Sequence, residues 1–101
     1  MVSMNVIRNV AFTVKDGKTA EFNKVLTNEV LPTMKSQPGF RHELAMLNGH
    51  DAVGLSVWVD KASAEKYDTA VYPTILKKLS PWIEGTPKVT NYDLAVSTLA
   101  V

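Results

Sequence analysis

The sequence has no cysteine among its 101 residues, so disulfide frameworks, thiolate metal sites and thiol nucleophiles are excluded. It also lacks an excess of either charge, since eleven Lys and Arg stand against ten Asp and Glu, a formal net charge of +1. The longest like-charge run is Lys77-Lys78. Nucleic-acid binding requires a basic stripe that releases counterions, and this composition does not support that class of function.

Long apolar runs are missing as well. No segment approaches the roughly 18 apolar residues of a membrane-spanning helix, and Met1 to Arg8 lacks the basic and apolar regions of a signal peptide. The two histidines, His42 and His50, do not have metal-site spacing, because catalytic zinc needs about three clustered ligands. We expect one cytoplasmic domain over residues 1–101, with no metal and no cofactor.

What is present is a plan of strand, helix and strand that occurs twice. Strand patterns cover Asn5 to Val14, Phe40 to Leu47, Ala52 to Val59 and Lys88 to Val96, and helical patterns cover Asp16 to Gln37 and a stretch from Lys61. Pro38-Gly39 and Gly85-Thr86-Pro87 are predicted to close the two helical stretches, because Gly adopts the left-handed cap conformation and Pro cannot continue a helix. This order predicts an α+β, ferredoxin-like βαββαβ fold with a four-stranded antiparallel sheet.

Local signals add detail to this plan. The run from Asn48 to Asp51, which contains Asn-Gly, predicts a hairpin between the second and third strands. Asp60 is suited to cap a helix that begins at Lys61. Pro32 predicts a kink or restart within the first helical stretch, and Pro73 predicts that the second stretch is divided into two helices.

The strands are apolar on both faces. In the first strand, one face carries Val6, Val10, Phe12 and Val14, and the other carries Ile7, Asn9, Ala11 and Thr13. A strand of this kind must be covered on both sides, whereas two helices cover only one face of a four-stranded sheet. We therefore expect a homodimer formed by sheet-to-sheet packing, with the tail from Ser97 to Val101 either reaching over the partner through Leu99 and Val101 or frayed.

The chain resembles the antibiotic biosynthesis monooxygenase-like family of dimeric α/β barrels. The residues that carry the resemblance are Leu31-Pro32, Pro38-Gly39-Phe40, Trp58-Val59-Asp60, and Tyr72-Pro73 ahead of Leu79. The family includes cofactor-free oxygenases acting on aromatic polyketide-like compounds, haem-degrading enzymes, isomerases and members of unknown activity. The resemblance implies two ferredoxin-like sheets packed as a dimeric barrel, but the fold is a weak guide to the reaction.

The haem-degrading branch of the family is similar in an Asn on the first strand and a Trp and a His on the second helix. Asn9 matches the first of these positions, but Tyr67 holds the Trp position and Lys77 the His position. Without that imidazole the usual axial ligand to haem iron is missing. Many oxygenase-like members also carry a His where this chain has Tyr67.

Two carboxylates on otherwise apolar helix faces are candidate catalytic groups. Burial would raise the pKa of Glu29 or Asp68 toward the range of a general base, which could take the proton of an acidic phenol or enol. The alternative is that both reach solvent or pair with lysines such as Lys24 or Lys78.

Five further candidates are assigned to a pocket between the sheet and the helices. His42 either transfers protons or is fixed by a hydrogen bond in the dimer interface. Trp58 and Tyr67 either stack on a planar substrate, with Tyr72 bonding its oxygen, or belong to the core. Asn9 must satisfy its amide on the backbone, on a ligand carbonyl or on dioxygen.

Two functions follow from these residues and the family resemblance. The first is a cofactor-independent monooxygenase that acts on a small aromatic molecule, with Asn9, Glu29, His42 and Tyr67 as catalytic residues. Substrate-binding residues in that hypothesis are Trp58, Asp68 and Tyr72. The second is a non-catalytic dimeric module that binds small molecules or is associated with stress.

Overall fold

The computed structural model describes residues 5–98, which fold in the order β-α-β-β-α-β. The elements are β1 (Val6–Val14), α1 (Thr19–Val25), the π-helical turn η1 (Leu26–Val30), α2 (Leu31–Lys35), β2 (Phe40–Asn48), β3 (Asp51–Trp58), α3 (Lys61–Ala70), α4 (Tyr72–Leu79), the 3₁₀ turn η2 (Ser80–Trp82) and β4 (Ile83–Asp93). The predicted α+β, ferredoxin-like fold is confirmed. Within the described residues, no helix is both long and apolar enough to cross a membrane.

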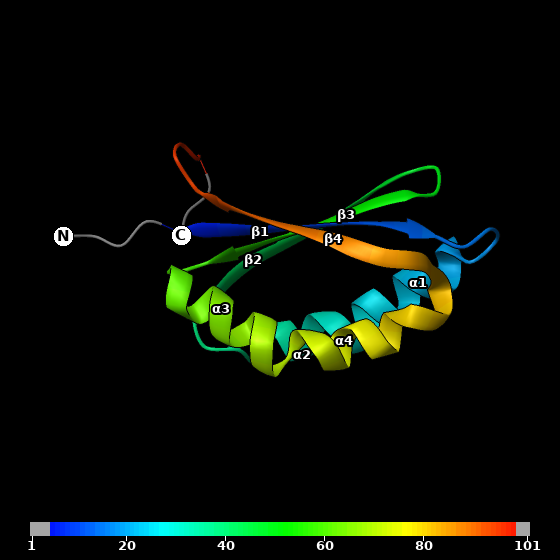
Figure 1. Ribbon diagram of the computed structural model, residues 1–101, viewed down its shortest axis with the longest axis horizontal. Helices are drawn as coiled ribbons and strands as arrows, with labels where there is room; N and C mark the ends of the chain where they lie inside the picture. Colours follow the sequence, from blue (N-terminus) through cyan, green and yellow to red (C-terminus); the bar gives the residue numbers. More distant parts are fainter. Residues whose placement is uncertain (1–4, 99–101) are drawn as a thin grey trace.

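The four strands form one antiparallel sheet in the order β2-β3-β1-β4, so that β1 and β3 are central and β2 and β4 are edges. Figure 1 shows the helices of residues 5–98 gathered on one side of this sheet, with none of them over the opposite side. The helix-covered side is called the inner face here and the other side the outer face.

The hydrophobic core lies between the inner face and the helices. Its buried members are Val6, Val14, Phe22, Val30, Met34, Ala52, Trp58, Ala64, Tyr67, Ile75, Leu79 and Ile83. Val6, Val10, Phe12 and Val14 share the inner face of β1, as their alternation predicts. One residue breaks this apolar series, because Arg8 occupies the same face and is also buried.

The first helical stretch is interrupted where Pro32 predicts a kink. Proline crowds the carbonyl four residues earlier, which here belongs to Asn28. The chain responds with the wide turn of η1, in which the Leu31 amide donates to the Leu26 carbonyl five residues back, and Pro32 then occupies the first turn of α2. The predicted irregularity is confirmed, and it takes the form of a π-helical turn.

In the second helical stretch, Asp60 caps α3 by accepting a 2.8 Å hydrogen bond from the Ser63 amide, as predicted. Pro73 lies in the first turn of α4, so the division into two helices is also confirmed.

The predicted end of this stretch and the predicted start of the last strand are wrong. The helix ends at Leu79, and the chain turns through Pro81 in η2. It then enters β4 at Ile83, which is buried opposite Val14. The segment 85–87, expected to terminate the helix, is instead a bulge inside β4 opposite Phe12.

The hairpin between β2 and β3 is confirmed, with Gly49 and His50 as its two-residue loop. At the other end of β2 the register shifts between Phe40 and His42. The extra residue Arg41 places Phe40 on the inner face against Trp58, although His42 lies on the outer face. The expectation that Phe40 and His42 share a face is therefore wrong. Leu99 and Val101, part of the predicted tail, lie outside the described residues.

Gly39 connects α2 to β2 in a conformation that a side chain would disturb. Its φ is +81°, and a Cβ atom there would lie 2.4 Å from Ser63 Oγ and 2.9 Å from Val59 Cγ1. We expect Gly39→Ala to lower the free energy of unfolding by about 2–4 kcal/mol, because backbone strain and overpacking add. Urea unfolding measures this loss.

Gly49→Ala is the matched control. Gly49 also has a positive φ of +62°, but nothing lies within 4 Å of the position of an added Cβ. The control should lose only about 1 kcal/mol, from backbone strain alone. Equal losses in the two variants would show that the contact with Ser63 does not matter.

Candidate functional site

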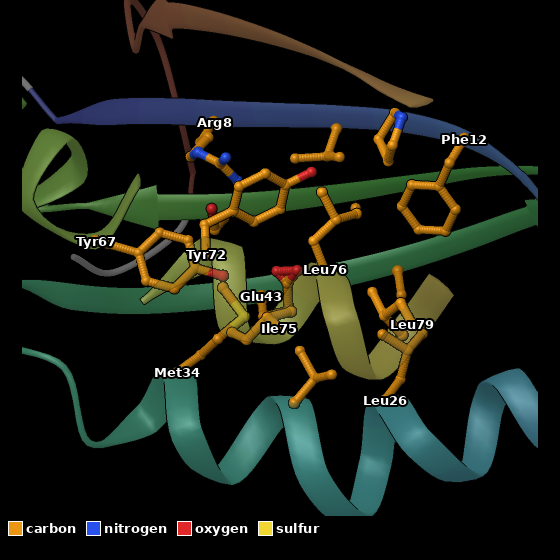
Figure 2. A pocket seen from close by; sticks show the side chains of 16 residues that line it. Arg8, Phe12, Leu26, Met34, Glu43, Tyr67, Tyr72, Ile75, Leu76 and Leu79 are labelled. Atoms are coloured by element: carbon orange, nitrogen blue, oxygen red, sulfur yellow. The ribbon is translucent and has the colours of Figure 1, made fainter. Parts of the chain in front are cut away.

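A cavity lies between the inner face of the sheet and the helices, with a volume of about 50 Å³. We call it the inner cavity; Figure 2 shows its lining. Most of the wall is apolar, and polar groups come from Arg8, Glu43, Ser56, Tyr67 and Tyr72. The apolar lining consists of Val10, Phe12, Leu26, Val30, Met34, Ala45, Gly54, Ile75, Leu76, Leu79 and Pro87.

Arg8 projects from β1 into this cavity and is only 2% exposed. Its Nη2 and Nε lie 2.5 Å and 3.2 Å from Asp68 Oδ1, which pairs the buried cation with a half-exposed carboxylate on α3. The guanidinium carbon also lies 4.0 Å from the centre of the Tyr72 ring and 5.3 Å from that of Tyr67. A charge at this depth is stable because its hydrogen bonds and the two ring faces replace water.

Glu43 comes from the edge strand β2 and lies in the same cross-strand row as Arg8, with Ser56 of β3 between them. Burial raises the pKa of the Glu43 carboxyl from 4.5 to about 8, and the positive charge of Arg8 opposes part of that rise. The Oε2 atom is buried and has no hydrogen-bond partner among residues 5–98. A buried polar atom of this kind is uncommon in folded proteins and marks a place where a ligand group could bond.

The two tyrosines of the cavity keep their protons through the neutral range. Burial is the largest cause of the raised pKa of both Tyr67 and Tyr72, and the Arg8 charge opposes it. Their phenol groups therefore act as neutral hydrogen-bonding groups and as aromatic surfaces.

The polar groups suit an organic ligand better than a metal ion. Within residues 5–98 there is no group of three or more His, Cys, Asp or Glu side chains that could hold a metal. The cavity instead presents a guanidinium, a carboxyl and two phenols above an apolar floor. These groups can bond the hydroxyl or carbonyl oxygen of a ring compound, and the floor can pack against its carbon atoms.

A second depression, which we call the outer groove, has a volume of about 320 Å³. The groove adjoins the inner cavity, because four residues line both of them: Leu26, Val30, Glu43 and Ala45. Asn23, Thr27 and Leu31 complete the groove, and the exposed positions of Asn23 and Thr27 open it to solvent. The groove thus runs between the π-helical turn η1 and the edge strand β2, with Glu43 at its inner end.

Three of the predicted site residues are in or beside the cavity. Tyr67 and Tyr72 line it, and Asp68 lies behind Arg8 as the partner of its guanidinium. Trp58 is not in the lining; it is fully buried, its ring centre lies 4.7 Å from that of Tyr67, and its indole N–H donates to Ser56 Oγ at 2.8 Å. Trp58 therefore belongs to the hydrophobic core and is not placed to stack on a ligand in the cavity.

Three other candidate residues do not line the cavity. Glu29 is half exposed, with Oε1 3.7 Å from Lys78 Nζ, as the lysine-pairing alternative states. Asn9 alternates with Arg8 along β1 and therefore lies on the outer face, opposite Leu55 and Thr90. His42 is also on the outer face, because the bulge at Arg41 changes the phase of β2.

Arg8 and Glu43 are the functional side chains that the sequence reasoning missed. A signal for Arg8 was available, since it alternates with Val6 and Val10 in a strand whose two faces are both apolar. For Glu43 the signal was weaker, because the bulge that sets the phase of β2 has no clear mark in the sequence.

No protein-family model matches this sequence, and no curated protein matches it. Solved structures do match the fold. SnoaB, a cofactor-independent oxygenase from Streptomyces nogalater, has a TM-score of 0.79 at 19% identity, covering 95% of this chain and 98% of that one. NE2512, a protein of unknown function from Nitrosomonas europaea, also has a TM-score of 0.79, at 16% identity and with 100% and 99% coverage.

A third similar structure carries a ligand. The monooxygenase from the ActVA-Orf6 gene of Streptomyces coelicolor, in complex with nanaomycin D, has a TM-score of 0.77 at 17% identity, covering 97% of this chain and 94% of that one. The resemblance to the antibiotic biosynthesis monooxygenase-like family is confirmed at the level of the fold. The chain has a monooxygenase-like fold, and its matches include proteins with and without a known activity.

The raised pKa of Glu43 predicts a pH-dependent stability. Below pH 4.5 the carboxyl is protonated in both the folded and the unfolded chain. As the pH rises toward about 8, the unfolded chain loses this proton and the folded chain keeps it, so stability falls and then levels off. Glu43→Gln should remove this loss, worth about 3–5 kcal/mol between pH 4 and 9.

The measurement is the free energy of unfolding in urea at several pH values, taken as the difference between Glu43→Gln and the parent. Glu29→Gln is the matched control, because Glu29 is half exposed and outside the cavity. A difference that stays constant with pH for Glu43→Gln would show that the Glu43 carboxyl titrates normally.

Proposed function

We propose that this protein binds a small aromatic molecule in the inner cavity and outer groove and oxidises it as a cofactor-independent monooxygenase. The observation that carries the proposal is the convergence of Arg8, Glu43, Tyr67 and Tyr72 on an apolar cavity. This convergence occurs in a fold shared with the cofactor-independent oxygenase SnoaB and with the ActVA-Orf6 monooxygenase.

The chemistry of the site fits an electron-rich ring with a hydroxyl group. Such a ring supplies the electrons for dioxygen itself: one oxygen atom enters the ring as a carbonyl, the other leaves as water, and the hydroxylated ring becomes a quinone. The contribution of the protein is to orient the ring and to stabilise negative charge on its oxygen. Arg8 is a fixed, buried positive charge suited to this task.

A second candidate is supported by the size of the inner cavity. Its volume of about 50 Å³ is below the roughly 300 Å³ of common ligand pockets, although the outer groove at about 320 Å³ reaches that range. In this alternative the chain is a non-catalytic module that binds small molecules in the groove. Binding without consumption of oxygen would identify it.

The test uses 1-naphthol, a planar hydroxylated ring, with calorimetry for binding and an oxygen electrode for turnover. Ala45→Trp should weaken binding at least tenfold. Ala45 lines both the cavity and the groove, so the indole ring of the introduced tryptophan would occupy the space that the ligand needs. Ala62→Trp is the matched control, since Ala62 is an exposed residue of α3 outside both depressions. Equal affinity in the two variants would contradict the proposed site.

The proposal includes a homodimer formed through the outer face of the sheet. Its apolar residues include Leu44 and Met46, each 44% exposed, and Tyr92, 54% exposed. Leu55 and Val53 lie beside them on β3. A second copy of the chain is the occupant we propose, because burying two such faces against each other removes apolar surface from water in both copies.

Leu44→Arg should convert the dimer to a monomer, since it places a charge in the apolar interface between the packed sheets. Leu47→Arg is the matched control, because Leu47 is similarly exposed, at 41%, but alternates onto the opposite face of β2. Sedimentation velocity at micromolar concentration measures both. A parent protein that sediments as a monomer would contradict the dimer.

A further inference from the structure

We infer that Glu43 is the proton acceptor of the site and that the ligand is bound by an ionisable ring hydroxyl whose proton Glu43 receives. The inference rests on the proposed function and adds to it the residue that accepts the proton of the ring hydroxyl. It concerns a residue of the edge strand β2, whereas the sequence indicated Glu29 and Asp68 for this role.

The position of Glu43 is the first argument. Its side chain is the one ionisable group, among the described residues, that lines both the inner cavity and the outer groove. A ring in the groove would lie against Leu26 and Val30, with its inward edge at the Glu43 carboxyl. The groove has room for a ring of that kind, and the inner cavity has room for little more than its hydroxyl group.

The unpaired oxygen is the second argument. Oε2 of Glu43 is buried and accepts no hydrogen bond, and Oε1 lies over Gly54, where an added Cβ atom would be 3.5 Å away. A glycine below the carboxyl leaves this part of the floor open. A ligand hydroxyl would supply the missing donor, so binding would remove the cost of an unsatisfied buried acceptor.

Charges around Glu43 favour the proton transfer. From β1, Arg8 lowers the cost of negative charge in the cavity, and its own partner Asp68 on α3 is half exposed. From α3, Tyr67 interacts electrostatically with the Glu43 carboxyl, and Tyr72 of α4 lines the same cavity; burial raises the pKa of both tyrosines. The lining residues from η1, α2 and β3 carry no ionisable side chain. Glu43 is therefore the cavity group that titrates between pH 6 and 9.

The proton transfer from the ligand hydroxyl to Glu43 needs no other reactant. The O–H bond of the ligand breaks, its proton forms a bond to a carboxylate oxygen of Glu43, and the electron pair stays on the ligand oxygen as an aryl oxide. Arg8 then faces a negative charge on the ligand in place of the charge on Glu43. A base whose pKa is close to the working pH accepts and returns such a proton efficiently.

The experiment compares 1-naphthol with 1-methoxynaphthalene, which has the same ring system but no hydroxyl proton. Affinity is measured by calorimetry at pH 6, 7, 8 and 9, where a phenolic hydroxyl with a pKa near 10 is still mostly protonated in solution. The affinity of 1-naphthol should rise about tenfold from pH 6 to pH 9 as Glu43 ionises, because a hydrogen bond to a charged acceptor is stronger than one to a neutral group. The methoxy compound should show no such rise.

Glu43→Gln should bind 1-naphthol with the same affinity at every pH, whereas Glu29→Gln, altered on an exposed carboxylate, should follow the parent. A tenfold rise that persists in Glu43→Gln, or that 1-methoxynaphthalene shares, would overturn the role of Glu43 and leave the proposed function standing. If neither ligand binds the parent at any pH, the proposed function and this inference are both overturned.

Discussion

The arrangement of the site depends on one buried cation. Arg8 occupies a position on β1 at which its neighbours on the same face are valines, and it remains there because Asp68 pairs with it and two tyrosine rings lie against it. This ties the centre of the sheet to α3 and α4. The same positive charge then acts on the other ionisable group in its row, the Glu43 carboxyl.

The edge strand and the irregular helix turn have a joint role. β2 has a neighbour on only one side, and the helix above it is opened by the π-helical turn that Pro32 induces. Between these two irregular elements lies the outer groove, with Leu26, Val30 and Glu43 shared with the cavity within. Wide helical turns of this kind are frequent at functional sites, and here the turn forms one wall of a groove of about 320 Å³ that adjoins the cavity.

Whether a feature was predicted correctly from the sequence depended on how far apart in the chain the interacting residues are. The cap at Asp60, the helix break at Pro73 and the hairpin at Gly49 depend on neighbouring residues and were predicted correctly. The boundary between α4 and β4 was not, because Ile83 enters the strand by pairing with Val14, far away in the sequence. Site residues followed the same division: the tyrosines of the helices were identified, and the face of each polar strand residue was not.

Alternation of side chains and the positions of Gly and Pro were enough to indicate four strands, their order along the chain and the apolar character of both sheet faces, since these depend on backbone geometry within a few residues. Which carboxyl is buried was decided by tertiary structure alone. A single extra residue at position 41 sets the phase of β2, and that phase sends Glu43 inward and His42 outward. The pKa of a carboxyl follows from its surroundings, which exist only once strands and helices from distant parts of the chain have packed together.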